Sequence, residues 1–154
     1  MDYYNNLELP FNFKNLDYQR VPDLQFDISN NSLLGEMYND KIDNGKHDLS
    51  HLNLDKWKNF AWSVYKLSPG KWVPPHVDHF GNYSKFYNIK NKNTVRRKLI
   101  FLENWKPGHF FILKGKVYTN WRANDYATWT NEDSHCGGNF GSEDRYTIQL
   151  TGSI

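Results

Sequence analysis

The sequence predicts a mainly β protein, a double-sheet jelly roll that follows short N-terminal helices. Short runs of β-branched and aromatic residues recur from Phe60 onward. Turn residues separate these runs, as at Pro69-Gly70 and Lys114-Gly115. The helical signals precede the runs and do not alternate with them, so the pattern favours a jelly roll over a parallel α/β fold.

Length and charge restrict the class of protein. The chain has 154 residues, which predicts one domain over 1–154, with an N-terminal arm and helices over 1–59 and a jelly-roll core over 60–154. Lys and Arg number 19 against 17 Asp and Glu, a net charge of +2. A general polyanion-binding protein is usually more basic. Aromatic residues make up 17% of the chain, and we expect them to fill the β core.

The first third of the chain carries the weakest signals. Residues 1–28 are polar and aromatic and predict an extended arm or a short edge strand that packs on the sheet. A short helix is predicted over Ser29 to Asp40, followed by a polar loop at Asn44 to His47, and a second helix over Lys56 to Asn59. Candidate starts for the second helix are Asn53, Asp55 and Ser50.

The remaining elements are strands and one long loop. The two prolines Pro74 and Pro75 interrupt one strand, which suits an edge or the mouth of a barrel. The polar stretch from Phe80 to Thr94 shows little periodicity and predicts a long loop of the kind that often forms a lid or binding segment. The predicted strands are Ala61–Leu67, Trp72–Asp78, Arg97–Leu102, His109–Leu113, Lys116–Trp121, Tyr126–Thr130 and Arg145–Thr151.

We expect a cytoplasmic protein that does not enter a membrane. The apolar runs are far shorter than the roughly 20 residues of a membrane span. The start, Met1 to Asn6, has neither a basic region nor an apolar core and so does not resemble a secretory signal. A single cysteine, Cys136, excludes an internal disulfide and fits a reducing compartment.

The triplet His76-Val77-Asp78 has the form of half a metal site. Residues i and i+2 of a strand point the same way, which would place an imidazole beside a carboxylate. His135 is the candidate third ligand, since two His and one carboxylate form a facial metal site with open positions. The alternative is a chance triplet in a surface turn. His79 alternates out of phase and is assigned to the rim, and ordinary roles are expected for the remaining histidines, His47, His51 and His109.

Together these motifs resemble a known family. The run P-G-x-x-x-P-P-H-x-D ending at Asp78, the later H-x-x-x-N from His135, and the R-x-x-I strand from Arg145 are similar to the Fe(II)/2-oxoglutarate dioxygenases. The closest patterns are those of the aspartyl/asparaginyl and prolyl hydroxylases. The likeness covers roughly Phe60 to Thr151. It implies a cupin-like double-stranded β-helix, one form of the jelly roll.

The resemblance also implies the chemistry. His76, Asp78 and His135 would hold Fe(II), with 2-oxoglutarate and O2 as cosubstrates and ascorbate as a further candidate cofactor. The cosubstrate is decarboxylated to succinate and CO2 while a substrate C–H bond gains a hydroxyl group. The metal supplies the difficult chemistry and no protein base is required, so no separate catalytic residue is predicted.

The resemblance assigns three residues to the cosubstrate. Arg145 would bind the C5 carboxylate through its guanidinium fork; the alternative is an ion pair with Glu143 or Asp144. Arg97 would face inward from its strand, although a register shift of one residue reverses the face. Trp72 stands where prolyl hydroxylases often carry an aromatic residue near the cosubstrate, or it is plain core.

The segment around His135 is predicted to be a loop. Asn139 matches an Asn of the aspartyl/asparaginyl branch and is interpreted as a loop-shaping residue. Three glycines, Gly137, Gly138 and Gly141, would let the loop bend tightly. Cys136 is not an expected ligand, because this iron chemistry uses oxygen and nitrogen donors.

The substrate is the least determined feature. The stretch Lys85 to Lys98 has six cations and no acid, interleaved with Phe86 and Tyr87. It predicts either an electrostatic rim for an anionic substrate or a solvated loop. DNA-dealkylating oxygenases carry a second Arg six residues after the first, where this chain has Thr151, so an amino-acid side chain, free or in a peptide, ranks above a nucleobase. Nucleic acid, another anion, and a non-catalytic jelly-roll binding protein stay open as alternatives. No oligomeric state is predicted.

Overall fold

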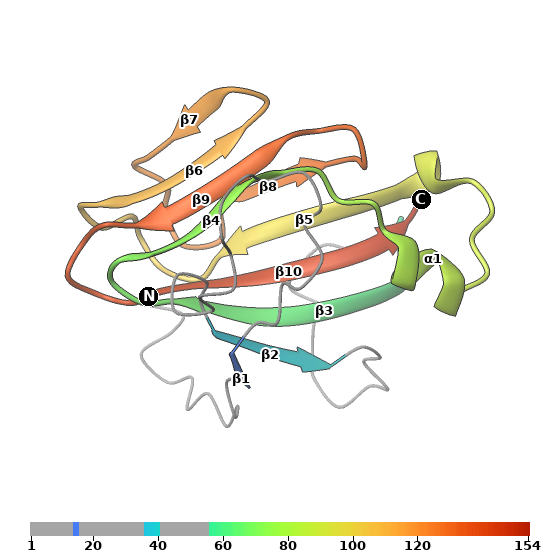
Figure 1. Cartoon of the computed structure of the whole chain (residues 1–154), viewed down its shortest axis with the longest axis horizontal. Helices are drawn as coiled ribbons and strands as arrows, with labels where there is room; N and C mark the ends of the chain where they lie inside the picture. The colour runs from blue at the N-terminus through green and yellow to red at the C-terminus, as the bar shows by residue number, and fades with distance from the viewer. Residues whose placement is uncertain (1–13, 16–35, 41–55) are drawn as a thin grey trace.

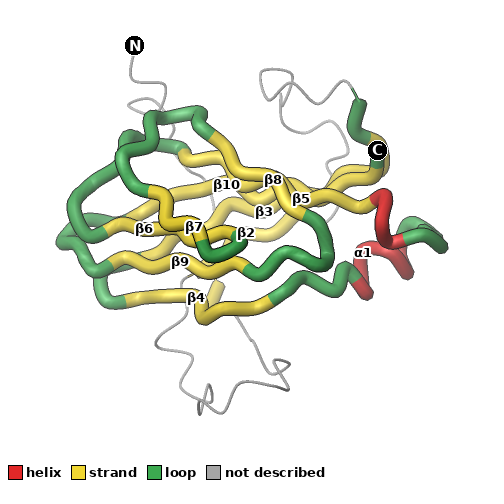
Figure 2. Tube along the Cα trace, turned by 90° about the horizontal axis from the view of Figure 1, so that it is seen from above, coloured by secondary structure: helices red, strands yellow, loops and turns green. Residues whose placement is uncertain are grey.

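The computed structural model describes residues 14–15, 36–40 and 56–154, which form two antiparallel sheets (Figures 1 and 2). The larger sheet has the order β1-β2-β3-β10-β5-β8 and the smaller sheet the order β4-β9-β6-β7. The strands of the larger sheet are β1 Lys14–Asn15, β2 Glu36–Asp40, β3 Lys58–Leu67, β10 Arg145–Ser153, β5 Val95–Phe101 and β8 Tyr126–Trp129. Those of the smaller sheet are β4 Lys71–His76, β9 His135–Asn139, β6 His109–Leu113 and β7 Lys116–Tyr118.

The path of the chain between the sheets makes this a cupin-like double-stranded β-helix. From β3 onward the chain crosses repeatedly from one sheet to the other, so that β3 and β10, the first and last core strands, are neighbours in the larger sheet. In the smaller sheet β4 and β9 are likewise neighbours. The predicted fold class is confirmed, and the chain has placed two strands distant in sequence, β4 and β9, side by side.

The core lies between the two sheets. Strand β6 alternates buried and partly exposed residues along its length, as expected of a strand with one face on the core. Phe101 of β5 stacks on Trp121 with ring centroids 4.0 Å and the ring planes 13° apart, a contact that buries much apolar area. The predicted aromatic core is therefore present. Its buried cluster comprises Leu99, Phe101, Phe111, Leu113, Trp121 and Trp129.

The prediction of N-terminal helices is wrong where the structure describes the chain. Residues Glu36–Asp40 form strand β2, which pairs antiparallel with β3, whereas residues 29–35 and the loop at 44–47 lie outside the described residues. A short helix is marginal by itself, and pairing along the edge of β3 satisfies the backbone of this segment. The short edge strand expected within 1–28 is represented by β1, which pairs with β2.

The second predicted helix is also wrong, because β3 begins at Lys58. Asn59 has φ 53°, a left-handed conformation that a right-handed helix excludes. Its candidate starts, residues 50, 53 and 55, lie outside the described residues.

The long loop predicted over Phe80 to Thr94 contains a short helix, α1 Gly81–Phe86, and a 3-10 turn, η3 Lys92–Thr94. The Tyr83 hydroxyl donates to the Asn59 carbonyl at 2.7 Å and ties α1 to the start of β3. A helix this short has no periodicity to detect in the sequence. Figure 1 shows α1 at the same end of the molecule as the C-terminus. No helix among the described residues has the length and apolar character needed to cross a membrane.

Candidate metal centre

The two prolines at the end of β4 set the geometry of the site. Val73 pairs with Gly137 and His76 pairs with His135, so β4 has one more residue than β9 between these pairs, a β-bulge. Proline lacks an N–H group and cannot continue the ladder, so the irregularity falls at Pro74-Pro75. The bulge brings His76 opposite His135, with ring centroids 4.2 Å apart.

Both histidines are held in the same tautomer by backbone carbonyls two residues upstream. His76 Nδ1 lies 2.8 Å from the Pro74 carbonyl oxygen, and His135 Nδ1 lies 3.1 Å from that of Asp133. A carbonyl only accepts, so each Nδ1 donates its proton, and the lone pair stands on each Nε2. This is how proteins orient imidazole ligands for a metal ion.

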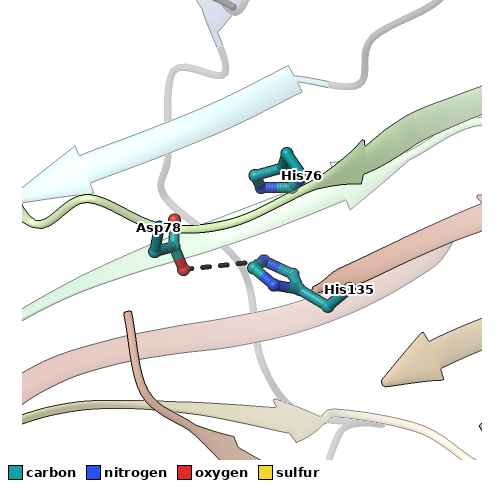
Figure 3. A group of neighbouring side chains, drawn as sticks. All are labelled: His76, Asp78 and His135. Atoms are coloured by element: carbon teal, nitrogen blue, oxygen red, sulfur yellow. Dashed lines mark ion pairs between the residues drawn. The ribbon is translucent and has the colours of Figure 1, made fainter. Parts of the chain in front are cut away.

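Asp78 completes the group, although it lies beyond the end of β4 and strand alternation does not place it. Its Oδ2 atom lies 3.5 Å from His135 Nε2. Ligand atoms of His76, Asp78 and His135 all lie within 4.8 Å of one another, and Figure 3 shows the three side chains converging. The structure thus brings together the three residues that the sequence analysis selected as ligands.

The electrostatics of the group suit a cation. Burial lowers the pKa of His135 to about 4, which keeps the ring neutral at ordinary pH. Burial by itself raises the pKa of Asp78. The positive charge of Arg97, the proximity of His135 and a hydrogen bond from Trp129 outweigh burial and hold this pKa below 3.8. Two imidazoles and one carboxylate are a donor set for Fe(II) and related divalent ions, so these residues could hold such an ion.

A cavity of about 30 Å³ adjoins the triad between the two sheets. Arg145 forms part of its wall, from the start of β10, and is only 4% exposed. The remaining lining residues come from both sheets: Tyr65, Val73, His76, Arg97, Leu99, Phe111, Trp129, His135, Cys136, Gly137, Thr147 and Gln149. The two candidate histidine ligands and the buried Arg145 guanidinium therefore line the same cavity.

Arg145 has backbone partners but no acidic one among the described residues. Its Nη1 donates to the carbonyls of Phe110, at 2.6 Å, and Gly138, at 3.2 Å, while its buried Nε has no hydrogen-bond acceptor there. Burial lowers its pKa to about 10. The alternative of an ion pair with Glu143 or Asp144 is not what the structure has.

Those two acids pair elsewhere. Asp144 lies 3.6 Å from Lys66 and Glu143 lies 3.1 Å from Lys106. The Arg145 guanidinium is thus a buried charge that faces a cavity and lacks a counterion from the described chain.

The other two cosubstrate candidates are placed differently. Arg97 faces the cavity, as its predicted register requires, but its Nη1 binds the Asp78 carboxylate at 3.1 Å. Lys98 points to the other face, where it is buried against the rings of Trp57 and Tyr126. Trp72 does not line the cavity; its neighbour Val73 does.

The segment from His135 to Asn139 is a strand and not the predicted loop. Gly137 and Gly138 do not bend it. A Cβ atom on Gly137 would lie 3.2 Å from Arg145 Nη2, and one on Gly138 would lie 2.4 Å from a Phe110 ring carbon. These glycines let the guanidinium and the aromatic ring approach the strand closely.

Asn139 does shape the turn that follows, from the end of the strand. Its buried amide donates to the carbonyls of Leu67 and Glu143, both at 2.7 Å, and its Oδ1 accepts from the Gly141 N–H at 3.0 Å. The turn into β10, and with it the position of Arg145, is tied to β3 through this side chain.

Sequence reasoning missed several polar cavity residues. Tyr65 of β3 and Thr147 and Gln149 of β10 line the cavity, as does Trp129, whose indole binds Asp78. Alternation along β10 from Arg145 would have placed 147 and 149 on the same face. Tyr65 and Trp129 carried no such signal, because nothing local shows which face of a core strand is inward.

Comparison with known proteins finds distantly similar solved structures and no family. No protein-family model matches the chain, and no curated protein matches its sequence. Among solved structures, a predicted oxalate decarboxylase from Thermotoga maritima is similar at 17% identity and TM-score 0.48, over 78% of this chain and 81% of that one. A putative sugar phosphate isomerase from Acidithiobacillus ferrooxidans has 12% identity and TM-score 0.48, with coverage of 90% and 74%. A cupin protein from Bacteroides fragilis has 11% identity and TM-score 0.44, with coverage of 63% and 68%.

Strand order and side-chain geometry therefore define the class. The chain is a cupin-like double-stranded β-helix with a possible metal site formed by His76, Asp78 and His135. Identities this low carry no argument about activity.

Proposed function

We propose that the protein is an Fe(II)- and 2-oxoglutarate-dependent dioxygenase. The observation that carries the proposal is the shared cavity. It is lined by the two histidines of a two-His, one-carboxylate group and by a buried guanidinium that has no carboxylate partner in the described part of the chain. A ligand that chelates a metal at one end and presents a carboxylate at the other would suit both the metal site and the guanidinium.

The guanidinium argues for an anion. A charge removed from water is strongly unfavourable unless it is paired and hydrogen-bonded. Arg145 has two backbone acceptors, which solvate it only in part. A carboxylate in the cavity would supply the missing counterion through charge-assisted hydrogen bonds.

The spacing fits a short diacid. Arg145 binds the Gly138 carbonyl, three residues along β9 from His135. At the rise of a β-strand, this is about 10 Å. An extended five-carbon diacid that binds the metal at one end and the guanidinium at the other spans a distance of this order.

Each residue then has a role. His76, Asp78 and His135 would hold Fe(II), which supplies the oxygen activation when bound. Arg145 would bind and orient the C5 carboxylate. The apolar side chains Leu99 and Phe111 line the cavity and would exclude water from it.

The substrate that this proposal favours is an amino-acid side chain in a peptide or protein. The segment after Asp78 would form a cationic approach to the site. Lys85, Lys90 and Lys92 are exposed, and Phe86 is 60% exposed. An acidic peptide fits such a surface; a net charge of +2 is low for a nucleic-acid binder.

The test is direct. Purified protein with Fe(II), 2-oxoglutarate and a panel of acidic peptides is assayed for succinate release and for peptide mass gains of one oxygen. Arg145→Met is the matched inactive variant, and Arg122→Met, an exposed arginine before β8, is the control. Absence of succinate with every peptide, together with no anaerobic binding of 2-oxoglutarate to the Fe(II) protein, would refute the proposal.

The size of the cavity supports a second candidate. A volume of about 30 Å³ holds about two waters, so a five-carbon diacid requires its walls to move apart. A metal-dependent protein that binds a smaller anion beside Arg145 needs no such movement. Thermal shifts with Mn(II) and a series of two- to five-carbon carboxylates separate the candidates, since only the dioxygenase favours the five-carbon keto acid.

A further inference from the structure

The two oxygen atoms of Asp78 have different partners. Oδ2 lies 3.5 Å from His135 Nε2, on the side of the histidine pair, and accepts a 2.8 Å hydrogen bond from the indole N–H of Trp129. Oδ1 accepts from Arg97 Nη1 at 3.1 Å. The carboxylate is thus oriented by two donors from β5 and β8, strands that contribute no metal ligand.

Arg97 is itself held firmly. Its Nε donates to Thr151 Oγ1 at 3.1 Å, and its Nη1 is also 3.3 Å from Gln149 Oε1. The ring of Phe80 lies 5.4 Å from the guanidinium carbon, in cation–π contact. These three partners and Asp78 come from β10 and from the loop between β4 and α1, and together they make Arg97 a fixed donor.

Trp129 is equally constrained. It is 1% exposed and belongs to the buried aromatic cluster. Its ring centroid lies 4.4 Å from that of His135. Its one hydrogen-bonding group therefore reaches the carboxylate from a rigid core position and defines where Oδ2 lies relative to the imidazole.

We infer that Arg97 and Trp129 are positioning residues that present Asp78 to the metal through Oδ2 alone. Arg97 keeps Oδ1 occupied, which prevents the carboxylate from chelating the ion with both oxygens. One coordination position that a bidentate Asp would fill stays available to exchangeable ligands. The inference rests on the metal-binding part of the proposed function and is independent of 2-oxoglutarate.

The charge of Arg97 and its orienting hydrogen bond have opposite effects on metal affinity. A fixed cation near the site repels a divalent ion, so loss of the charge by itself would strengthen metal binding. Loss of orientation would weaken it, because partners that orient ligands typically contribute 10- to 100-fold in affinity. The sign of the change therefore decides between orientation and simple repulsion.

The experiment titrates the full-length protein with Mn(II), measuring affinity and the water-proton relaxation of the bound ion. Arg97→Met removes the Oδ1 donor and Trp129→Phe removes the Oδ2 donor without a change of charge. The controls are Arg96→Met, whose guanidinium binds the Asn93 and Val95 carbonyls, and Trp105→Phe, whose indole binds the His109 carbonyl. Thermal unfolding confirms that each variant folds.

We expect Arg97→Met and Trp129→Phe to weaken Mn(II) binding by about 10- to 100-fold, while both controls bind like wild type. Relaxation should show one fewer exchangeable water in Arg97→Met and no loss in Trp129→Phe. If Arg97→Met fails to fold, Arg97→Lys, which keeps the charge and loses the guanidinium fork, replaces it with the same expectation for affinity.

Two results would overturn the inference, and they differ. If wild type binds Mn(II) and Arg97→Met binds it equally well or more tightly, the positioning role is wrong and the proposed function stands. If wild type binds no divalent ion at all, the metal site, the proposed function and this inference fail together.

Discussion

The two ends of the cavity differ in how complete they are. At the metal end, His76, Asp78 and His135 all have hydrogen-bond partners that fix their orientation. At the other end, Arg145 is buried with one nitrogen that lacks an acceptor among the described residues. The described residues therefore orient all three side chains of the metal end, whereas they leave part of the Arg145 guanidinium without an acceptor.

This difference has a structural origin. The metal end is built from two neighbouring strands and the turns beside them, where backbone carbonyls are within reach of each imidazole. Arg145 enters from the other sheet and meets carbonyls of β6 and β9, which are acceptors without net charge. Loss of the Arg145 side chain should therefore leave metal binding intact, whereas loss of a metal ligand should also weaken a cosubstrate that chelates the ion.

The largest effect is expected at the metal end. His135→Ala removes a candidate ligand, and no other histidine among the described residues belongs to the group apart from His76. Fe(II) affinity should therefore fall by more than about 100-fold, beyond the range of an orienting partner. Isothermal titration under anaerobic conditions measures it. His79→Ala, which removes the exposed neighbour of Asp78, is the matched control and should bind normally. Equal affinities in the two variants would remove His135 from the site.

The next largest effect is expected at the guanidinium end. Arg145→Met should leave Fe(II) affinity unchanged and weaken 2-oxoglutarate binding by about 100-fold, because two charge-assisted hydrogen bonds are lost. Arg145→Lys keeps the charge and should retain part of the affinity. The anaerobic charge-transfer absorption of the Fe(II)–keto acid complex reports binding. Normal cosubstrate affinity in Arg145→Met would show that Arg145 has another role.

The metal end should also make metal-free stability depend on pH. Burial lowers the pKa of His135 from 6.5 to about 4 in the folded state, so the unfolded state binds more protons between these values. The free energy of unfolding should therefore fall as pH drops from about 6.5 to 4, by an amount on the order of 3 kcal/mol. Asp78 adds to this only near and below its ordinary pKa of 3.8.

Urea unfolding across this pH range checks the prediction. His135→Gln lacks the titrating group and should show a flatter profile than wild type. A Lys114→Gln variant changes a charge that pairs with Asp133, close to His135 in sequence, without touching the imidazole. A wild-type profile that is already flat would mean that His135 is accessible to protons in the folded state.

The smallest effect is expected outside the cavity. Replacing Lys85 and Lys90 with Glu should weaken binding of a glutamate-rich peptide a few-fold at low salt and hardly at all at high salt, since exposed charges are screened. Arg122→Glu, at an exposed position before β8, is the control. Fluorescence anisotropy measures it, with a single-stranded oligonucleotide as competitor. Stronger binding of the oligonucleotide would favour nucleic acid as the substrate.

Part of the site could be predicted from the sequence and part could not. His76 and Asp78 are two residues apart in the chain, and the prolines before them mark a break in a strand, so this half of the site is local. His135 was found only as a distant residue of the right chemistry. His135 lies in a strand whose glycines allow the Arg145 guanidinium and the Phe110 ring to approach closely. The same glycines, taken as a local sequence, predict a turn.

Elements without periodicity were the ones mispredicted. Strand β2 has five residues and exists because β3 has an edge to pair with. Helix α1 has six residues and depends on the Tyr83 hydroxyl bond to the Asn59 carbonyl. Both depend on contacts with distant residues, which no local window contains.

The sequence by itself determined the β-rich class, the core strands from Ala61 onward except β9, and the chemical identity of the three candidate ligands, because alternation and residue type are local properties. Only the tertiary structure decided that Arg97 hydrogen-bonds to Asp78 and that Arg145 faces the cavity without a counterion from the described chain. Those roles depend on which strands become neighbours and on their register. A shift of one residue would exchange every inward side chain for an outward one.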